Sequence, residues 1–355
     1  MLDAGADPND GETPYHSVEH DGVPCLDLLW EHFNEDSRSI AIQHKVDFPD
    51  AAGLRLLLEL GADPNARRFF DRPPLHGCVF RGHDRELFET LLEFGADPNL
   101  TDQSGRTPYA LAARAGQQEI MKILVENGAM LDLKPTDRFL SACALGDAET
   151  VAAMLEETPD IVERLDDDRT VICEVAANGN TTGVRVMLEA GFDVNTPGSV
   201  WREGPIHRAA TGGHLDTVKL LYERGADLTM RDASYSASPL GWGEHGGHVD
   251  IVDFLQRDAS RLDLRDALEW GKTERVAELL GDTDVDAPIA GAEPGVLLRS
   301  AAYGGQLPLV AMLLEKGADR DLRNSDGMTA LDYATTQGHA EVAELLRQEP
   351  KTRRS

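Results

Sequence analysis

The chain has 355 residues, of which 41% are hydrophobic and 6% aromatic, and its 34 basic and 63 acidic side chains give a formal net charge of −29. This acidic excess disfavours binding to the phosphate backbone of nucleic acids, and no apolar run resembles a signal peptide or is long enough to span a bilayer. Four cysteines lie far apart without a Cys-x-x-Cys pair, which favours reduced core residues in a cytoplasmic protein: Cys25, Cys78, Cys143 and Cys173.

One tripeptide returns along the chain at a nearly constant distance. Gly-Ala-Asp begins at residues 5, 61, 95, 225 and 317, and degenerate copies begin at residues 128 and 191. From 61 to 95 and from 191 to 225 the distance is 34 residues, and from 95 to 128 it is 33. A fixed period of this size predicts a stacked array of repeats and favours binding over catalysis.

A second phrase follows most copies of the tripeptide after about a dozen residues. Its first residue, often Thr or Ser, is expected to cap a helix, and its proline suits the first helical position. A glycine should end this helix in the left-handed conformation, and a second helix with apolar residues at helical spacing should follow. The versions of the phrase are Thr13–His16, Pro73–His76, Thr107–Ala110, Gly204–His207, Ser238–Gly241 and Thr329–Asp332.

The phrase and the period together resemble the ankyrin repeat, in the style of bacterial ankyrin-like proteins, over nearly the whole chain. The resemblance implies an all-α repeat solenoid of about eleven helix pairs joined by β-turn fingers. It also implies one domain over residues 1–348. The basic residues that follow, at 349–355, are expected to form a frayed tail. The first helices of the pairs are expected to begin near residues 13, 38, 74, 108, 137, 170, 205, 239, 264, 296 and 330.

Some repeats depart from this pattern. The pair at residues 38–60 follows the first pair without a finger, and the pairs that begin near 137 and 264 lack the Thr-Pro-Leu-His phrase. We therefore expect changes of curvature near residues 35–60, 132–168 and 258–295. Residues 1–5 resemble the last turn of a second helix. We therefore expect an upstream segment or another element to cover this end of the array. Self-association through the N-terminal end is an alternative.

The histidines are mostly explained by the repeat. Seven of the eleven occupy either the fourth place of the phrase or the place after the helix-ending glycine, where an imidazole should tie a turn to its neighbour: His16, His76, His207, His83, His214, His248 and His339. The sequence contains no zinc-protease, P-loop or serine-nucleophile motif. We therefore assign no catalytic residue, no metal and no cofactor, and favour a non-enzymatic role.

In ankyrin-like stacks the fingers and one face of each first helix form a concave groove. The places two and five residues before the helix-ending glycine should face it, and Trp, Tyr and Arg are the residues that most often dominate interfaces. The predicted partner-binding residues are Trp201, Arg202, Glu203, Arg208, Tyr235, Trp242, His245, Asp266, Glu269, Tyr303 and Tyr333, with a weaker patch at Phe69, Phe70 and Arg72. Helix packing is the alternative role for Trp242, Tyr303 and Tyr333.

The resemblance implies a non-enzymatic interaction module that holds a protein or peptide in its groove, mainly through the C-terminal half. One alternative is a small-molecule binder or enzyme, in which His245 and Glu269 form an acid–base pair and Tyr303 donates a proton. Another alternative is that the acidic surface inhibits a basic partner protein, whereas the simplest interpretation of the charge is solubility. Neither nucleic acid nor a membrane is an expected partner.

Overall fold

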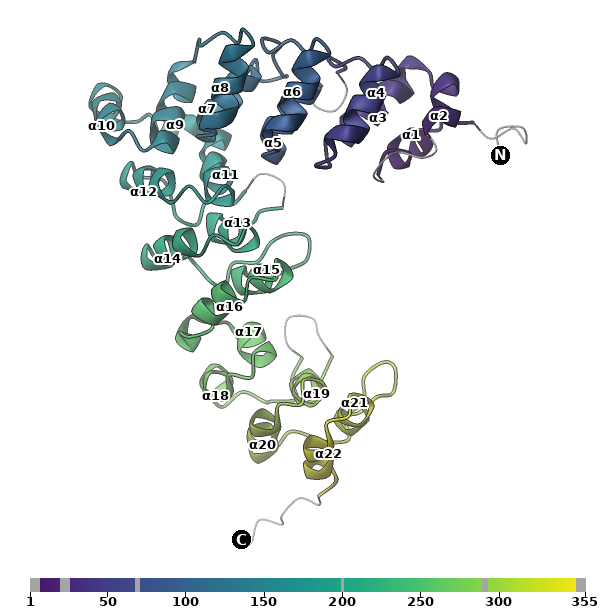
Figure 1. The fold of residues 1–355 in the computed structure, drawn as a ribbon. Coiled ribbons are helices and arrows are strands. Elements are labelled where there is room, and N and C mark those ends of the chain that lie inside the picture. Colours follow the sequence, from purple (N-terminus) through teal and green to yellow (C-terminus); the bar gives the residue numbers. More distant parts are fainter. Residues whose placement is uncertain (1–6, 20–25, 68–70, 199–200, 289–292, 349–355) are drawn as a thin grey trace. The chain divides into compact units, whose positions relative to one another are not determined.

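A computed structural model describes residues 7–19, 26–67, 71–198, 201–288 and 293–348 (Figure 1). Over these residues the chain is helical and contains no β-strand. It forms two compact units, residues 1–196 and residues 197–355, which we call the N-terminal and C-terminal units. The expected helix end at residues 1–5 and the tail at 349–355 lie outside the described residues, and the expected changes of curvature stay predictions.

The N-terminal unit contains six helix pairs within its described part. They are α1 (Glu12–His16) with α2 (Leu26–Leu29), α3 (Glu35–Lys45) with α4 (Ala51–Glu59), α5 (Pro74–Arg81) with α6 (Arg85–Glu93), α7 (Pro108–Arg114) with α8 (Gln118–Glu126), α9 (Pro135–Leu145) with α10 (Ala148–Glu157), and α11 (Val171–Ala177) with α12 (Thr181–Glu189). Short 3-10 segments follow α2 at Trp30–His32 and precede α11 at Glu163–Thr170.

The C-terminal unit contains five pairs over the residues described there. They are α13 (Pro205–Thr211) with α14 (Leu215–Glu223), α15 (Pro239–His245) with α16 (Val249–Leu255), α17 (Leu264–Glu269) with α18 (Thr273–Leu280), α19 (Val296–Tyr303) with α20 (Leu307–Glu315), and α21 (Ala330–Thr336) with α22 (Ala340–Arg347). All eleven first helices begin within three residues of the expected places. The prediction of an all-α array of paired helices is therefore confirmed.

The first helices begin and end at the kinds of residue that the sequence predicted, namely side-chain caps, prolines and left-handed glycines. The side chains of Thr107 and Ser238 accept hydrogen bonds from the backbone N–H groups of Ala110 and Gly241 at 3.2 and 3.3 Å, and a proline follows each cap. These bonds satisfy donors that the helix itself leaves unpaired. Left-handed glycines lie just beyond the C-terminal ends, with φ of 67°, 76°, 73° and 78° at Gly82, Gly213, Gly247 and Gly338.

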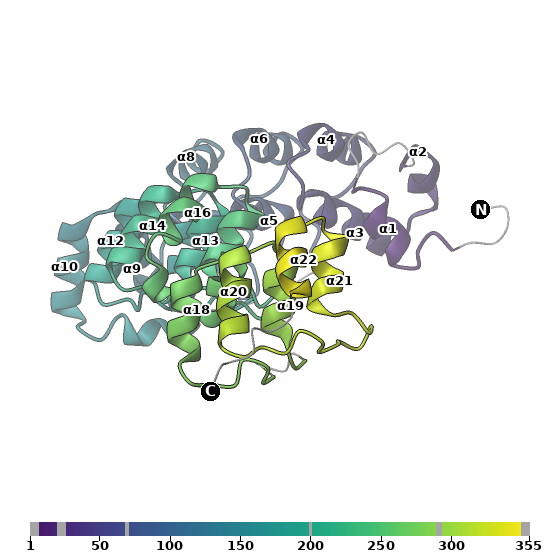
Figure 2. The same cartoon turned by 90° about the horizontal axis from the view of Figure 1, so that it is seen from below.

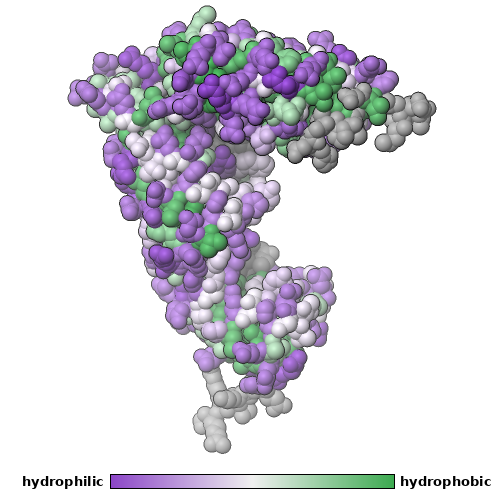
Figure 3. All heavy atoms as spheres, viewed as in Figure 1, coloured by the Kyte–Doolittle hydropathy of each residue, from purple (hydrophilic) through white to green (hydrophobic). Residues whose placement is uncertain are grey.

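Many successive pairs stack with first helix against first helix and second against second, as with α13 and α15 or α18 and α20 (Figures 1 and 2), whereas α9 packs against the second helix α12 of the next pair. Pairs of small residues at the contacts let the backbones approach closely, and all of them are buried: Ala112, Ala113, Ala209, Ala210, Ala301 and Ala302. Leucine, isoleucine, valine and phenylalanine fill the space between the helices. Hydrophilic residues cover most of the face seen in Figure 3.

Three histidines each connect a repeat to the one before it. The ring of His339 donates from Nε2 to the backbone carbonyl of Tyr303 at 2.9 Å, and that of His248 donates to Thr211 at 2.9 Å. His83 makes the same bond to Val46 at 2.6 Å. These histidines follow a helix-ending glycine, so the expected role of this position is confirmed in all three.

The third residue of a first helix is a second tether. His76 and His207 occupy this place, are buried, and donate from Nε2 to a carbonyl in the following finger at 2.9 Å. In α9 and α17, which lack the phrase, Asp137 and Asp266 occupy the same place and are also buried. Both aspartates pair with arginines instead, because a buried carboxylate needs a close cation.

One of these aspartates belongs to a buried ion cluster of the N-terminal unit. Asp137 Oδ1 accepts from Arg114 Nη1 at 2.7 Å and from Arg106 Nε at 3.0 Å. The two guanidinium groups also hold Asp168, at 2.9 Å from Arg114 and 2.5 Å from Arg106. The cluster thereby joins α7, α9 and the segment before α11, where the usual finger contacts are replaced.

Candidate functional site

Two neighbouring fingers of the C-terminal unit present aromatic side chains to solvent. Trp201 is 51% exposed and Tyr235 is 72% exposed. The backbone N–H of Ala233 donates to the carbonyl of Trp201 at 2.7 Å, so the two fingers lie side by side. Because a turn without strands has little core to fill, these rings are not required for packing.

The carboxylate of Asp232 holds the second finger in shape. It accepts hydrogen bonds from the backbone N–H groups of Ser234, Tyr235 and Ala237 at 2.7 to 2.8 Å, and from the indole N–H of Trp242 at 3.1 Å. Burial alone would raise the pKa of Asp232, but the bonds from this backbone hold it below its ordinary value. The finger and α15 are therefore fixed by one buried anion.

Trp242 connects the finger aromatics to the first helix. Its ring lies edge-to-face with Tyr235 at a centroid distance of 5.8 Å and with His245 at 5.4 Å. Trp242 is half-buried, whereas the two neighbours are exposed. The structure thus brings together three of the predicted residues in one aromatic row and places Trp201 on the adjoining finger.

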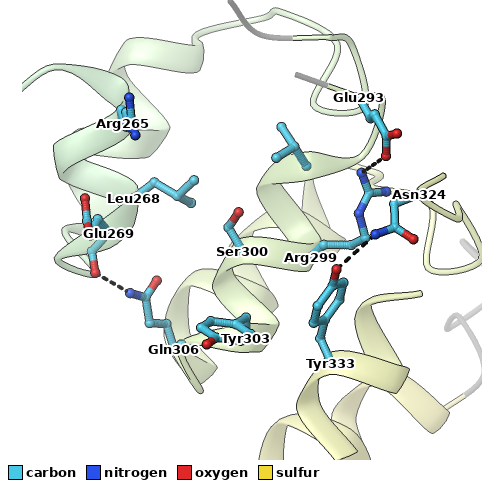
Figure 4. Close-up of a pocket in the computed structure, with 12 residues that line it drawn as sticks. Arg265, Leu268, Glu269, Glu293, Arg299, Ser300, Tyr303, Gln306, Asn324 and Tyr333 are labelled. Carbon is cyan, nitrogen blue, oxygen red and sulfur yellow. Dashed lines mark hydrogen bonds and ion pairs between the residues drawn. The ribbon is translucent and has the colours of Figure 1, made fainter. Parts of the chain in front are cut away.

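A hollow of about 640 Å³ opens between α17, α19 and α21 of the same unit (Figure 4). Side chains from three consecutive repeats line it, with Glu269 from α17, Tyr303 from α19 and Tyr333 from α21 among the predicted residues. The two tyrosine rings lie edge-to-face at 6.0 Å. The full lining is Arg265, Leu268, Glu269, Glu293, Val296, Arg299, Ser300, Tyr303, Gly304, Gln306, Asn324 and Tyr333.

Hydrogen bonds fix the walls of this hollow. The side-chain amide of Gln306 donates to the backbone carbonyl of Glu269 at 2.8 Å, and that of Asn324 donates to the hydroxyl of Tyr333 at 2.9 Å. The pKa of the Glu269 carboxyl lies above its ordinary value, first because of desolvation and then because Asp266 and Glu244 carry like charge. These bonds hold the walls of the hollow in place, and acidic side chains stand on both walls, Glu269 on one and Glu293 on the other.

Two predicted contact residues are turned inward instead. Asp266 is 2% exposed and pairs with Arg231 at 3.0 Å, and Glu203 is buried beside Arg208 at 3.3 Å. Neither carboxylate is presented to solvent, so the expectation of direct partner contact by Asp266 and Glu203 is corrected. Their charge instead fixes the arginines next to them.

The remaining predicted residues are placed as follows. Arg202 is exposed in the finger, with a left-handed φ of 57°, and Arg208 is half-exposed on α13. Phe69 and Phe70 lie outside the described residues. Arg72 is half-buried, and its guanidinium lies 5.0 Å from the ring centroid of the exposed Phe80.

The proposed acid–base pair is not assembled. His245 contacts the ring of Trp242, is not part of the lining of the hollow, and forms no hydrogen bond or ion pair with Glu269. No three His, Cys, Asp or Glu side chains are grouped as metal ligands in the described part of the chain. Cys78, Cys143 and Cys173 are buried and form no disulfide with one another, and burial raises the pKa of Cys143 to about 12.

Several residues of the hollow were missed from the sequence. Arg299 and Gln306 stand outside the two places counted back from the helix-ending glycine, and Glu293 and Asn324 lie in fingers without an aromatic residue. A count that included the residue after the helix-ending glycine would have found Gln306. No comparable signal marks Glu293 or Asn324.

Comparisons with known proteins agree with this architecture. A family model described as "Ankyrin repeats (3 copies)" matches residues 39–138, 75–164, 139–232 and 176–266. A second model, "Ankyrin repeats (many copies)", matches residues 298–347. Together the matches cover well over half of the chain. No helix in the described residues is both long and apolar enough to cross a membrane.

Individual relatives are similar over short stretches only. The chain is 51% identical over 49 residues, 14% of its length, to a probable E3 ubiquitin-protein ligase XBOS33 of Oryza sativa subsp. japonica, of which it covers 9%. It is 35% identical over 79 residues to Delta-latroinsectotoxin-Lt1a of Latrodectus tredecimguttatus, with 22% of this chain and 6% of the toxin covered. It is 36% identical over 81 residues to the ankyrin repeat and SAM domain-containing protein 6 of Mus musculus, with 22% and 9% covered. The chain thus spans less than a tenth of the length of these relatives.

Proposed function

Since the chain belongs to the ankyrin-repeat family, whose repeats are typical protein–protein interaction modules, we propose that its C-terminal unit binds a protein or peptide partner. The binding surface consists of the aromatic row Tyr235, Trp242 and His245, the adjoining Trp201, and the hollow that contains Tyr303. We call this set the aromatic surface. The partner itself is not specified by the family.

One observation carries the proposal. Trp201, Tyr235 and Tyr303 are 51%, 72% and 55% exposed, although aromatic side chains of this size gain free energy when they are removed from water. Grouped exposed apolar side chains with polar neighbours mark interaction sites. Tryptophan and tyrosine are also the residues most often responsible for binding energy at protein interfaces.

The surface is held rigidly before any partner arrives. Asp232 fixes the finger that carries Tyr235, and the ring of His339 holds the carbonyl of Tyr303. A preorganised surface loses less conformational entropy on binding than a mobile one. This rigidity favours recognition of a folded or extended polypeptide by a fixed frame.

The test compares captured partners. Wild-type protein and the Trp201→Ala/Tyr235→Ala variant are used as baits in extract of the source cell, and bound proteins are identified by mass spectrometry. We expect specific partners to be lost with the variant but kept by a control that changes an exposed residue of a second helix, Val249→Ala. Equal recovery of partner proteins by the wild type and the double variant would exclude the aromatic surface as the binding site.

The charge distribution supports a second candidate, the binding of a basic protein by the acidic N-terminal unit. Residues 1–196 carry 37 of the 63 acidic side chains but 16 of the 34 basic ones. Such a surface attracts a cationic partner most strongly at low ionic strength. An affinity that does not fall across a salt series would exclude it.

A further inference from the structure

The hollow between α17, α19 and α21 is large enough for a long side chain. Its volume of about 640 Å³ far exceeds the space of about 30 Å³ that one water molecule occupies in the liquid. Glu269 lies on the α17 wall, on the left of Figure 4, and Arg299 lies on the opposite wall with Glu293. Each wall thus carries one basic and one acidic side chain, Arg265 with Glu269 on one and Arg299 with Glu293 on the other.

The positive charges of Arg265 and Arg231 act on the Glu269 carboxylate, but neither arginine forms an ion pair with it. Among the described residues, none forms an ion pair or hydrogen bond with its side chain, and only its backbone carbonyl is engaged, by Gln306. Arg265, one turn earlier on α17, donates instead to the carbonyl of Ser236 at 3.3 Å. Asp266 and Glu244 add like charge nearby. Glu269 is thus an acceptor available to a ligand.

The opposite wall is less available to an anion. The guanidinium of Arg299 is buried, and its Nη2 atom lies 3.8 Å from the Glu293 carboxylate. Its Nη1 atom is inaccessible, and a methyl group built at Gly295 would come within 3.2 Å of it. An entering carboxylate could therefore not reach this nitrogen without a rearrangement of the wall.

Aromatic rings complete the accessible part of the hollow. Tyr303 is 55% exposed and stands beside Tyr333. The face of a tyrosine ring attracts an ammonium or guanidinium group, and the effect grows when the cation is partly removed from water. A carboxylate and two such rings on neighbouring repeats present the complement of a basic side chain.

We infer that this hollow takes an arginine or lysine side chain of the polypeptide partner, between Glu269 and the rings of Tyr303 and Tyr333. The inference rests on the proposed function, because it assumes that a polypeptide lies on the aromatic surface. The aliphatic part of the basic side chain packs against Leu268, and its charged end reaches the carboxylate. This contact gives the surface a preference for a basic residue at one position.

A random peptide library displayed on phage tests this preference with the full chain. Selection is run in parallel on wild type, Glu269→Gln, Glu274→Gln and Trp201→Ala/Tyr235→Ala. Glu274 is exposed on α18 of the same repeat and is absent from the hollow, so its replacement removes the same charge elsewhere. Binding of the selected peptides is then measured by fluorescence anisotropy.

We expect wild type and Glu274→Gln to enrich peptides with Arg or Lys at one shared position. Replacing that residue by norleucine should weaken binding to wild type about tenfold, but should change binding to Glu269→Gln little. Three results would each overturn the inference. They are selected peptides that share no basic residue, selected peptides that share an acidic residue, and a preference for a basic residue that Glu269→Gln retains. Absence of any peptide dependent on Trp201 and Tyr235 would overturn the proposed function as well.

Discussion

The Nη2 atom of Arg231 lies 3.0 Å from the Oδ1 atom of Asp266, a carboxylate that is buried in the third place of α17. The same nitrogen also lies 2.6 Å from Asp263, the residue that caps this helix. Burial and the like charge of Asp263 raise the pKa of Asp266, while Arg231 opposes the rise. The arginine thereby connects the finger before α15 to the next repeat.

Replacing Arg231 by leucine should destabilise the C-terminal unit by about 3 to 5 kcal/mol, because a buried carboxylate is left without its cation. Urea unfolding of the full chain measures the loss, and hydrogen exchange locates it in α15 and α17. Asp266→Asn should cost less, because it removes the buried charge together with the ion pair. An unchanged unfolding midpoint for Arg231→Leu would contradict this role.

Gly305 and Gly338 form a matched pair for testing the histidine tether. Both have left-handed φ, of 66° and 78°, but a methyl group at Gly305 would come within 2.5 Å of the His339 ring, whereas at Gly338 it meets nothing. Gly338→Ala should cost about 1 to 2 kcal/mol from the backbone alone. Gly305→Ala should cost about 1 kcal/mol more, through the disturbed bond to Tyr303. Equal losses in chemical denaturation would argue against the tether.

The buried His207 should make stability depend on pH. Burial lowers its pKa to about 4 from the ordinary value of 6.5, so below pH 6.5 the unfolded chain binds a proton that the folded chain does not. The unfolding free energy should therefore fall as the pH drops from 6.5 to about 4, by at most about 3 kcal/mol from this group.

His207→Gln provides the control for that pH profile, since other groups also titrate in acid. The difference between the wild-type and variant unfolding free energies should change across this window, because glutamine binds no proton. Parallel profiles from pH 7 to 4 would show that His207 titrates normally in the folded chain.

Replacing an exposed aromatic residue should change the unfolding free energy less than replacing one that is hydrogen-bonded and half-buried. Trp201→Ala and Tyr235→Ala remove exposed rings and should change the unfolding free energy by less than about 0.5 kcal/mol. Trp242→Ala should cost about 1 to 3 kcal/mol, because it removes a half-buried ring and leaves Asp232 without the indole donor. Thermal denaturation distinguishes the two groups, and a comparable loss for all three would contradict the assigned roles.

The helices were largely predictable because the signals that begin and end them are local. A cap, a proline and a glycine act within one turn, so Thr107, Pro108 and Gly82 indicate boundaries without knowledge of the tertiary structure. Four starting positions differ from the expected ones, by one residue at α1 and α11, by two at α9 and by three at α3. What each helix faces depends on its neighbours and was harder to predict.

Asp266 shows why part of the site escaped prediction. Counting five residues back from the helix-ending Gly271 gives an outward place in the longer helices, as for Trp242 on α15. Helix α17 has only six residues, so the same count reaches the third helical place, which is covered by the preceding finger. The partner that holds it there, Arg231, is 35 residues away and carries no signal in the sequence.

The hydrogen bonds from the rings of His83, His248 and His339 affect which residues of this protein can change during evolution. Each ring donates a hydrogen bond to a backbone carbonyl, a group that every amino acid supplies. The bond therefore does not depend on the side chain of the residue that accepts it. The residue at position 303 therefore anchors the following repeat whether or not it is a tyrosine. New specificities can accumulate at such positions one at a time while the stack keeps its geometry.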